Sequence, residues 1–366
     1  MNNIEKIENI ERISDFEIPI MYDSDSKFES ILREKLDLYS NFVGNLKIDS
    51  KIRKSVALDC KQIPKIINYY LKADVAKAIR STKTILDKFK HNSLFFTKYE
   101  NAHKSINNIS YSSYLFKGRV ESNTKITEEG MFHIPFNQRE IIKSQRYSIP
   151  GIPCIYLGES SYTVWRELGE PAEELLNVCI FELEKSLKLI NLAYSSNDIL
   201  ELNNAISETN IQKINEILKI YPLIIACSMK NEKSDRNFKV EYIFPQLIMM
   251  NLEHLNCDGI VYHSNKVGSS FCSYLSRCYA FPAYFDDSWN NSNLKFKMRN
   301  SSPINFKEFL LYNNSMAAVL PANSQKELIT NYHRDMIYFA GRIMRYNDTI
   351  FFKFDNYLIS NLYRML

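Results

Sequence analysis

Several sequence signals are missing from this chain, and each absence excludes a class of protein or site. The seven cysteines are odd in number and scattered, and no CxxC pair occurs among them. This spacing argues against a zinc site and favours reduced, buried thiols. No uninterrupted apolar run is long enough to cross a bilayer. We therefore expect no metal and no membrane partner.

Phosphate-binding loops are missing as well. The chain has only nine glycines, and neither a Walker-type nor a GxGxxG motif occurs in it. Any phosphate group must therefore be bound by side chains and by main-chain amides at strand ends. The net charge of +4 is too small to indicate nucleic acid as a partner. Acidic residues lie among the apolar ones at the amino terminus, unlike in a signal peptide, so a cytoplasmic protein is predicted.

The composition that remains is that of a globular protein. Hydrophobic residues make up 45% of the 366 residues and charged residues 24%, which is enough apolar material for a sizeable core. A chain of this length is expected to form two or three domains.

The first part of the chain is predicted to be helical after a loosely held arm of about 25 residues. Apolar residues over 27–46 indicate one helix. Over 63–71 they repeat at i, i+3, i+4, i+7 and i+8, and a second such set follows over 75–89. These two segments predict an antiparallel helical pair that buries one seam.

Short β-like runs replace this pattern from residue 110, with helical segments between some of them. The mixture predicts an α+β domain and not a regular βαβ repeat. A helix is expected over 194–220, followed by an apolar run at 221–229, and a buried helix over 244–255. The expected strands are 114–120, 131–136, 153–157, 177–183, 187–192 and 260–262.

Charged residues gather around one of these strands, at 153–157. Arg146 precedes it and a Pro-Gly turn, and a helix begins directly after it. Ser160 or Ser161 can cap that helix by accepting a free main-chain N–H, and Glu167 lies within the helix. Charges at strand ends are a common way to build a site on a rigid support, although each of these charges also fits a solvated surface.

The order of these motifs resembles the RES domain, a family named for an arginine, a glutamate and a serine. The resemblance covers about half the chain, from residue 114 to 282. It consists of an aromatic-basic strand at 116–119, an Arg-aromatic-polar stretch with its turn at 146–151, and the "YL" strand at 155–157. Glu167 follows in the next helix, and an Asp-Gly-hydrophobic strand at 257–264 ends in the serine.

This resemblance implies an ADP-ribosyltransferase-like mixed sheet that acts on NAD⁺ as its substrate. Glu167 would stabilise the positive charge that develops on the ribose. Arg119 and Arg146 would hold the pyrophosphate, since arginine forms bidentate, charge-assisted bonds. Tyr156 would pack on the nicotinamide or ribose, and Ser264 would bond the ribose or the nicotinamide amide.

The sequence departs from the family at its first arginine. Lys117 stands directly after the aromatic residue, where many members have arginine, so Arg119 is expected to take that role. His263 lies beside Ser264, but adjacent strand residues point to opposite faces, which argues against a direct serine–histidine relay. His133 has apolar neighbours and is expected to make a structural hydrogen bond.

The predicted organisation is a helical region over 1–109, a RES-like catalytic domain over 110–285 and a carboxy-terminal extension over 286–366. The helical region contains none of the named site residues, so it is expected to control access, assembly or partner choice. The function implied is cleavage of the nicotinamide–ribose bond by a bacterial toxin or defence effector. Modification of a protein target and a non-catalytic nucleotide-binding module are the alternatives. An antitoxin or regulatory protein and a homo-oligomer remain open as partners.

Overall fold

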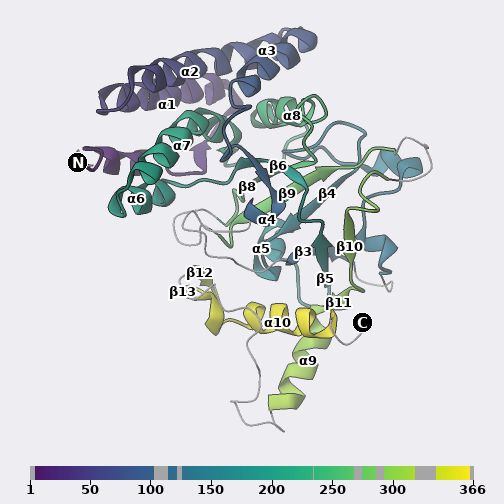
Figure 1. The fold of residues 1–366 in the computed structure, drawn as a ribbon. Helices are drawn as coiled ribbons and strands as arrows, with labels where there is room; N and C mark the ends of the chain where they lie inside the picture. Colours follow the sequence, from purple (N-terminus) through teal and green to yellow (C-terminus); the bar gives the residue numbers. More distant parts are fainter. Residues whose placement is uncertain are drawn as a thin grey trace. The chain divides into compact units, whose positions relative to one another are not determined.

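The chain forms two compact units, each built from more than one stretch of sequence (Figure 1). The computed structural model describes residues 5–102, 114–121, 126–233, 235–267, 274–285, 292–317 and 335–362. The first unit contains Met1–Lys98, Lys143–Pro150 and Lys188–Ser270, and the second contains Tyr99–Ile142, Gly151–Leu187 and Phe271–Leu366. The predicted domain boundaries at residues 109 and 285 stay a prediction.

The first unit is mainly helical, with short strands. Its helices are α1 (Asp25–Asn45), α2 (Ser50–Leu71), α3 (Val75–Asp87), α6 (Ser196–Asn204), α7 (Glu208–Cys227) and α8 (Ile243–Met249), with 3₁₀ turns η1 (Ile10–Phe16) and η4 (Val240–Tyr242). Its strands are β1 (Ile20–Tyr22), β2 (Phe96–Lys98), β6 (Lys188–Leu192), β7 (Met229–Asn231) and β8 (Gly259–His263).

Helices α1, α2 and α3 follow the predicted apolar periodicity and lie side by side (Figure 1). Asp49 and Asp74 cap α2 and α3 by accepting main-chain N–H groups, at 2.8 Å and 3.2 Å respectively. The buried face of α1 packs on α7, where the Tyr39 and Tyr221 rings are stacked with centroids 5.4 Å apart. The Tyr39 hydroxyl donates to the Leu218 carbonyl, so the hydroxyl is buried without losing its hydrogen bond.

The expectation of a loose amino-terminal arm is wrong. Ile7, Ile10, Ile13 and Phe16 are all buried, and their spacing of three residues is the period of a 3₁₀ turn. β1 pairs in parallel with β7, which ties the segment to the end of α7. Burial of several large apolar side chains is sufficient to hold a segment in place.

The apolar run at 221–229 is not separate from the preceding helix. Residues up to Cys227 continue α7, and nearly all of them are buried on every side. A continuously apolar segment does not show by periodicity whether it is helix or strand, so the sequence pattern does not reveal that this run continues the helix. In the same unit β6 pairs antiparallel with β2 and parallel with β8. The predicted α+β class with a mixed sheet is confirmed.

The second unit contains more strands. They are β3 (Tyr114–Val120), β4 (Cys154–Gly158), β5 (Leu176–Leu183), β9 (Arg277–Pro282), β10 (Met298–Asn300), β11 (Ile304–Asn305), β12 (Met336–Phe339) and β13 (Arg342–Arg345). Its helices are α4 (Tyr99–Ala102), α5 (Ser161–Glu167), α9 (Phe306–Ala317) and α10 (Ile350–Leu362), with 3₁₀ turns η2 (Glu129–Met131), η3 (Phe136–Ile141) and η5 (Tyr346–Asp348).

Five strands of this unit form an antiparallel arrangement in the order β10-β5-β3-β4-β9, and β11 also pairs with β5. Ser160 caps α5 as predicted, because its Oγ accepts the Thr163 N–H at 3.1 Å. The segment 131–136 is not the expected strand, since it lies between η2 and η3. One of its carbonyls, that of Phe132, accepts from the Lys117 amine instead of from a neighbouring strand.

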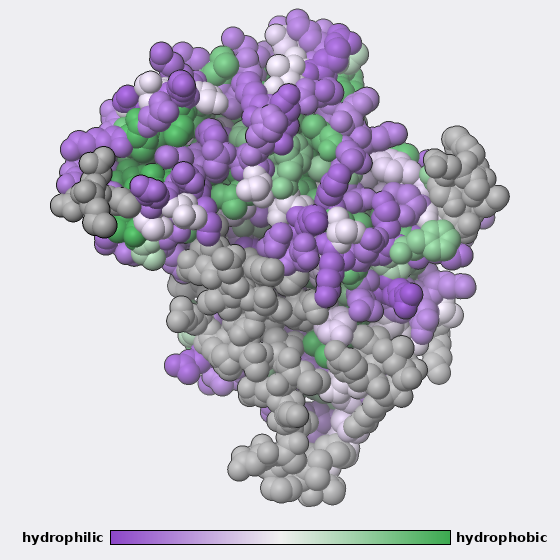
Figure 2. Space-filling model, viewed as in Figure 1, coloured by the Kyte–Doolittle hydropathy of each residue, from purple (hydrophilic) through white to green (hydrophobic). Residues whose placement is uncertain are grey.

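The surface over α2 and α3 is mainly hydrophilic, with small separated hydrophobic areas (Figure 2). Leu58 and Leu71 of α2 are exposed apolar residues. Among the described residues, no helix combines the length and apolar character that crossing a membrane requires.

Candidate functional site

Arg146 belongs to a short segment that is tightly held inside the first unit. The preceding residue, Gln145, accepts a hydrogen bond through its carbonyl from the Gln246 side chain of α8, at 3.0 Å. The following residue, Tyr147, is buried, and its ring lies 4.2 Å from that of Tyr262 in β8. The Arg146 backbone is therefore fixed on both sides, which is what a preorganised binding group requires.

The Arg146 guanidinium is held by groups at the end of α7 and in η4. Its Nη1 donates to the Cys227 carbonyl at 2.9 Å and lies 3.5 Å from the Glu241 carbonyl. Its Cζ lies 4.9 Å from the centre of the Tyr242 ring, a cation–π contact. Cys227 is the last residue of α7, where carbonyls lack helical partners and a cation is favourable. Arg146 thus caps this helix with one nitrogen.

The charge of Arg146 is not compensated by a carboxylate within the described part of the chain. Its Nε and Nη2 make no hydrogen bond to a described residue, so they keep their donors for another group. Lys239 adds a second cation, with its Nζ 5.1 Å from the centre of the same Tyr242 ring. Two cations on one aromatic ring form a site suited to an anionic ligand with an aromatic or sugar ring.

Lys239 and Tyr242 were not among the predicted site residues. They lie almost a hundred positions from Arg146 in a segment with no recognisable motif. Only the fold of the first unit, which places η4 beside the end of α7, brings the three side chains together.

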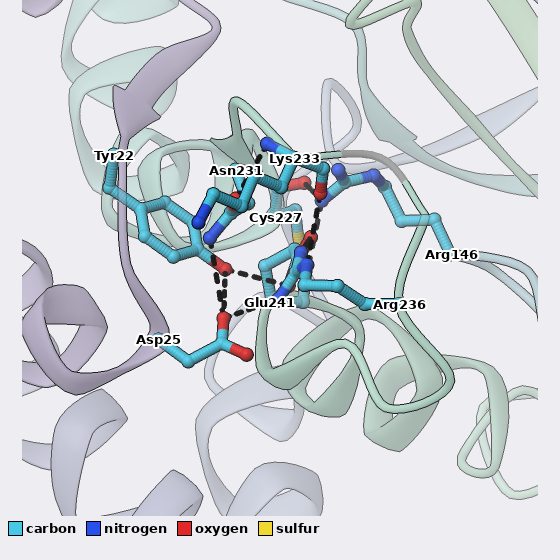
Figure 3. A network of polar contacts seen from close by, with 8 residues as sticks. All are labelled: Tyr22, Asp25, Arg146, Cys227, Asn231, Lys233, Arg236 and Glu241. Carbon is cyan, nitrogen blue, oxygen red and sulfur yellow. Dashed lines mark hydrogen bonds and ion pairs between the residues drawn. The ribbon is translucent and has the colours of Figure 1, made fainter.

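A polar network lies next to Arg146 and connects η4 to the amino-terminal segment (Figure 3). Arg236 pairs with Glu241 at 2.5 Å and also with Asp25. The Tyr22 hydroxyl donates to the other oxygen of Glu241 at 2.7 Å, and Asn231 donates to Asp25 at 3.3 Å. Arg236, in contrast to Arg146, is neutralised by two carboxylates.

Ser264 is placed at the end of β8, as the sequence predicts, and lies in the same unit as Arg146. It is buried, and its Oγ accepts the N–H groups of Lys266 and Val267, both at 3.1 Å. A serine that accepts main-chain N–H groups two and three residues later stabilises a turn. Its predicted role at the ribose or nicotinamide stays a prediction.

Lys117 and Arg119 are two residues apart on β3, so their side chains point to the same face. The half-buried Lys117 amine donates to the Phe132 carbonyl at 2.6 Å. Burial lowers the pKa of Lys117 to about 8, and the nearby Arg119 charge acts in the same direction. Either cation could serve as the basic group that the sequence pattern places on this strand.

Glu167 lies on α5, which covers the other face of β3. A Cβ atom on Gly118 would lie 2.5 Å from Val164 and 2.8 Å from Leu168, so only glycine permits this close packing. Successive residues of a strand point to opposite faces of the sheet. Gly118 faces α5, so the next residue, Arg119, lies on the face away from α5. Arg119 therefore lies on the face of β3 opposite to the helix that carries Glu167. Their catalytic roles stay predictions.

Tyr156 is half-buried in the middle of β4, opposite Ala280 of β9. His133 donates a hydrogen bond from its Nδ1 to the Ile134 carbonyl, at 2.7 Å, and burial lowers the pKa of this histidine. Contact with a main-chain carbonyl fits the structural role expected for His133.

The described cysteines are all free, and they are poor candidates for a nucleophile. Burial raises the pKa of Cys227, next to Arg146, to about 12, and that of Cys179, beside Lys117, to a similar value. Thiols with such pKa values are neutral at physiological pH, and the thiolate is the reactive form. No cluster of three or more His, Cys, Asp or Glu side chains suited to a metal ion occurs among the residues that the structure describes.

Comparisons with known proteins point to a toxin-like relative. The chain is 28% identical over 308 residues to a Bacillus subtilis (strain 168) protein named "Putative toxin YopC", covering 80% of this chain and 68% of the relative. No family model matches the chain. Among solved structures, the M. tuberculosis MbcT–MbcA toxin–antitoxin complex aligns with 56% of this chain and 88% of its own chain, at 11% identity and a TM-score of 0.29. A TM-score this low supports no conclusion about fold or function.

Proposed function

We propose that this chain is a toxin-like enzyme that consumes NAD⁺ by cleaving the bond between nicotinamide and ribose. The proposal combines the ordered motifs that resemble the RES domain with the similarity to a relative named as a toxin. The observation that carries it is Arg146, a preorganised arginine without a carboxylate partner in the described residues, placed where the motif order predicts a pyrophosphate ligand.

The reaction breaks the C1′–N bond of the nicotinamide riboside, and the bonding electron pair leaves with the nicotinamide nitrogen. Positive charge develops on the ribose in an oxocarbenium-like state, and an acceptor oxygen then bonds to C1′ and loses its proton. A fixed carboxylate such as Glu167 would stabilise that charge, because oriented charges need no reorganisation during the reaction. Water, phosphate or a protein side chain could each provide this acceptor oxygen.

The diphosphate of NAD⁺ suits the donors of Arg146. Its Nε and Nη2 can form a bidentate pair with phosphate oxygens while Nη1 stays on the Cys227 carbonyl. Lys239 would add positive charge, and the Tyr242 ring between the two cations would contact the neighbouring ribose or base. On β3, Lys117 and Arg119 are the candidates for the basic group that the motif order predicts on that strand.

The test is release of nicotinamide by the purified full-length chain supplied with NAD⁺, with and without phosphate. Glu167→Gln keeps the side-chain size and removes the charge, so turnover should fall by ~10²-fold or more if the carboxylate stabilises the oxocarbenium ion. Glu173→Gln is the matched control, because Glu173 is an exposed carboxylate six residues away in sequence. Full turnover in Glu167→Gln would remove Glu167 from the mechanism.

The same experiment separates the alternative functions. Release of nicotinamide that requires an added protein, with ADP-ribose appearing on that protein, would favour modification of a target. Binding of ADP-ribose without release under any condition would favour a non-catalytic nucleotide-binding module. A toxin of this kind also needs a neutralising partner, and we propose an antitoxin protein in that role. Co-expression with such a partner should abolish nicotinamide release.

A further inference from the structure

We infer that Arg236 positions Arg146 for its anionic ligand, and that the amino-terminal residues Tyr22 and Asp25 take part in this support. The inference rests on the proposed function and assigns to the helical region a task that the sequence does not indicate. Arg236 would not touch the substrate. It acts through η4, which holds the Arg146 guanidinium.

The carboxylate of Glu241 is the centre of the support. It is buried, with only 4% of the residue exposed, and both of its oxygens are occupied. Arg236 donates to Oε1 at 2.5 Å and Tyr22 donates to Oε2 at 2.7 Å. Arg236 also pairs with Asp25 in the first turn of α1, and its Nε donates to the Lys233 carbonyl at 3.0 Å. A buried carboxylate with this set of partners has one well-defined orientation.

The position of Glu241 affects Arg146 directly, because the two residues are in contact. The Glu241 carbonyl lies 3.5 Å from Arg146 Nη1, and the next residue, Tyr242, provides the ring beneath the guanidinium. Two of the three groups that hold Arg146 therefore come from consecutive residues of η4. Any rotation of η4 would move both of them together.

The network also keeps the positive charge of Arg146 available for a ligand. Arg236 neutralises Glu241, so Arg146 is not drawn into an ion pair. Without Arg236, the buried Glu241 carboxylate would lack its cation, which is costly. Arg146 already lies beside the Glu241 main chain and would be the nearest replacement. Pairing of Arg146 with Glu241 would remove the positive charge that an anionic ligand needs.

The experiment measures the affinity of the full-length protein for ADP-ribose by calorimetry. Arg236→Gln should weaken binding by about tenfold or more, because an Arg146 drawn to Glu241 would lose at least one charged hydrogen bond to the ligand. Arg236→Lys keeps the charge and should restore most of the affinity, and Tyr22→Phe should weaken binding less than Arg236→Gln. Arg33→Gln is the matched control, because Arg33 pairs at 2.6 Å with Glu29 on α1 and does not contact the network.

A double-mutant cycle with Arg146→Ala distinguishes positioning from general destabilisation. If Arg236 acts through Arg146, Arg236→Gln should have little further effect on ADP-ribose affinity in the Arg146→Ala background. An equal loss in both backgrounds, or an unchanged affinity in the Arg236→Gln single variant, would overturn the inference while leaving the proposed function intact. Absence of ADP-ribose binding by the unmodified protein would instead overturn the proposed function itself, and the inference with it. Tyr22→Phe, which removes one hydrogen bond to Glu241, keeps the test decisive in the same cycle if Arg236→Gln does not fold.

Discussion

Replacement of Lys117 by methionine should make the protein more stable at neutral pH and less active. Methionine has a similar length but no charge, so the change removes the amine from the face of β3 that it shares with Arg119. Burial lowers the pKa of Lys117 from 10.5 to about 8. A lysine with a lowered pKa is less favourably placed as a cation in the folded protein than in the unfolded chain.

The magnitude follows from this shift. A change of about 2.5 pKa units corresponds to ~3 kcal/mol of unfolding free energy lost at pH 7, where the amine is charged in both states. Removing the amine also removes its hydrogen bond to the Phe132 carbonyl, at a cost of ~1–2 kcal/mol. The expected net effect of Lys117→Met is therefore a stabilisation of ~1–2 kcal/mol at pH 7.

The sign of the pH dependence provides the sharper test. Between about pH 8 and pH 10.5 the unfolded chain binds the proton of Lys117 more strongly than the folded protein does. The contribution of Lys117 to the free energy of unfolding therefore rises with pH across this range. Urea denaturation at pH 7 and pH 10 should show the advantage of Lys117→Met shrinking and then reversing as the hydrogen bond becomes the larger effect.

The exposed Lys54 of α2 provides the control, because Lys54→Met should change stability little at either pH. An advantage of Lys117→Met that is equal at pH 7 and pH 10 would refute the depressed pKa. A stabilised variant that releases nicotinamide as fast as the unmodified protein would show that Lys117 is not needed for the proposed reaction. A partly buried cation that serves a function is expected to lower the stability of the protein and yet to be required for its activity.

Two further predictions concern stability. Phe16→Ala should lower the free energy of unfolding by about 3–4 kcal/mol, because Phe16 is 5% exposed and packs on Tyr39 and Phe42; a loss below ~0.5 kcal/mol in urea denaturation would show that the amino-terminal segment is loose after all. Burial raises the pKa of Asp355 from 3.8 to about 7, so the folded protein holds this proton more strongly and the Asp355 contribution to stability falls as pH rises from about 4 to 7. Asp355→Asn should therefore reduce the loss of stability between pH 5 and pH 8, and an unchanged difference between these pH values would contradict the raised pKa.

The elements with a regular apolar period could be predicted from the sequence, and those with unusual periods could not. Helices α1, α2 and α3 and strand β3 lie where the pattern places them. The apolar residues of the amino-terminal segment repeat every three positions, a period that matches neither an α-helix nor a strand, so its burial does not show in the sequence pattern. The segment at 131–136 has the composition of a strand, but it lies over the β3 face and its Phe132 carbonyl binds a side chain.

The candidate site could be predicted only where short motifs mark it. Arg146 and Ser264 stand out because each adjoins a recognisable turn or strand end. Tyr242 and Arg236 carry no such mark, and their importance comes from contacts across nearly a hundred residues of sequence or more. The sequence also does not show which face of β3 is covered by α5. Gly118 lies on that face, where only glycine permits the close packing.

Four cations differ in how the protein compensates their charge, and this separates structural cations from those available to a ligand. Lys88 pairs with the buried Asp59, and Arg236 pairs with Asp25 and Glu241, so carboxylates of the protein neutralise both charges. Lys117 and Arg146 instead donate to main-chain carbonyls, which fix the side chain but leave its charge uncancelled by any carboxylate in the described residues. At Lys117 this arrangement costs stability, because burial disfavours the charged amine and lowers its pKa. An anionic ligand at Lys117 would relieve that cost, so Lys117→Met should raise the stability of the free protein and reduce its stabilisation by ADP-ribose.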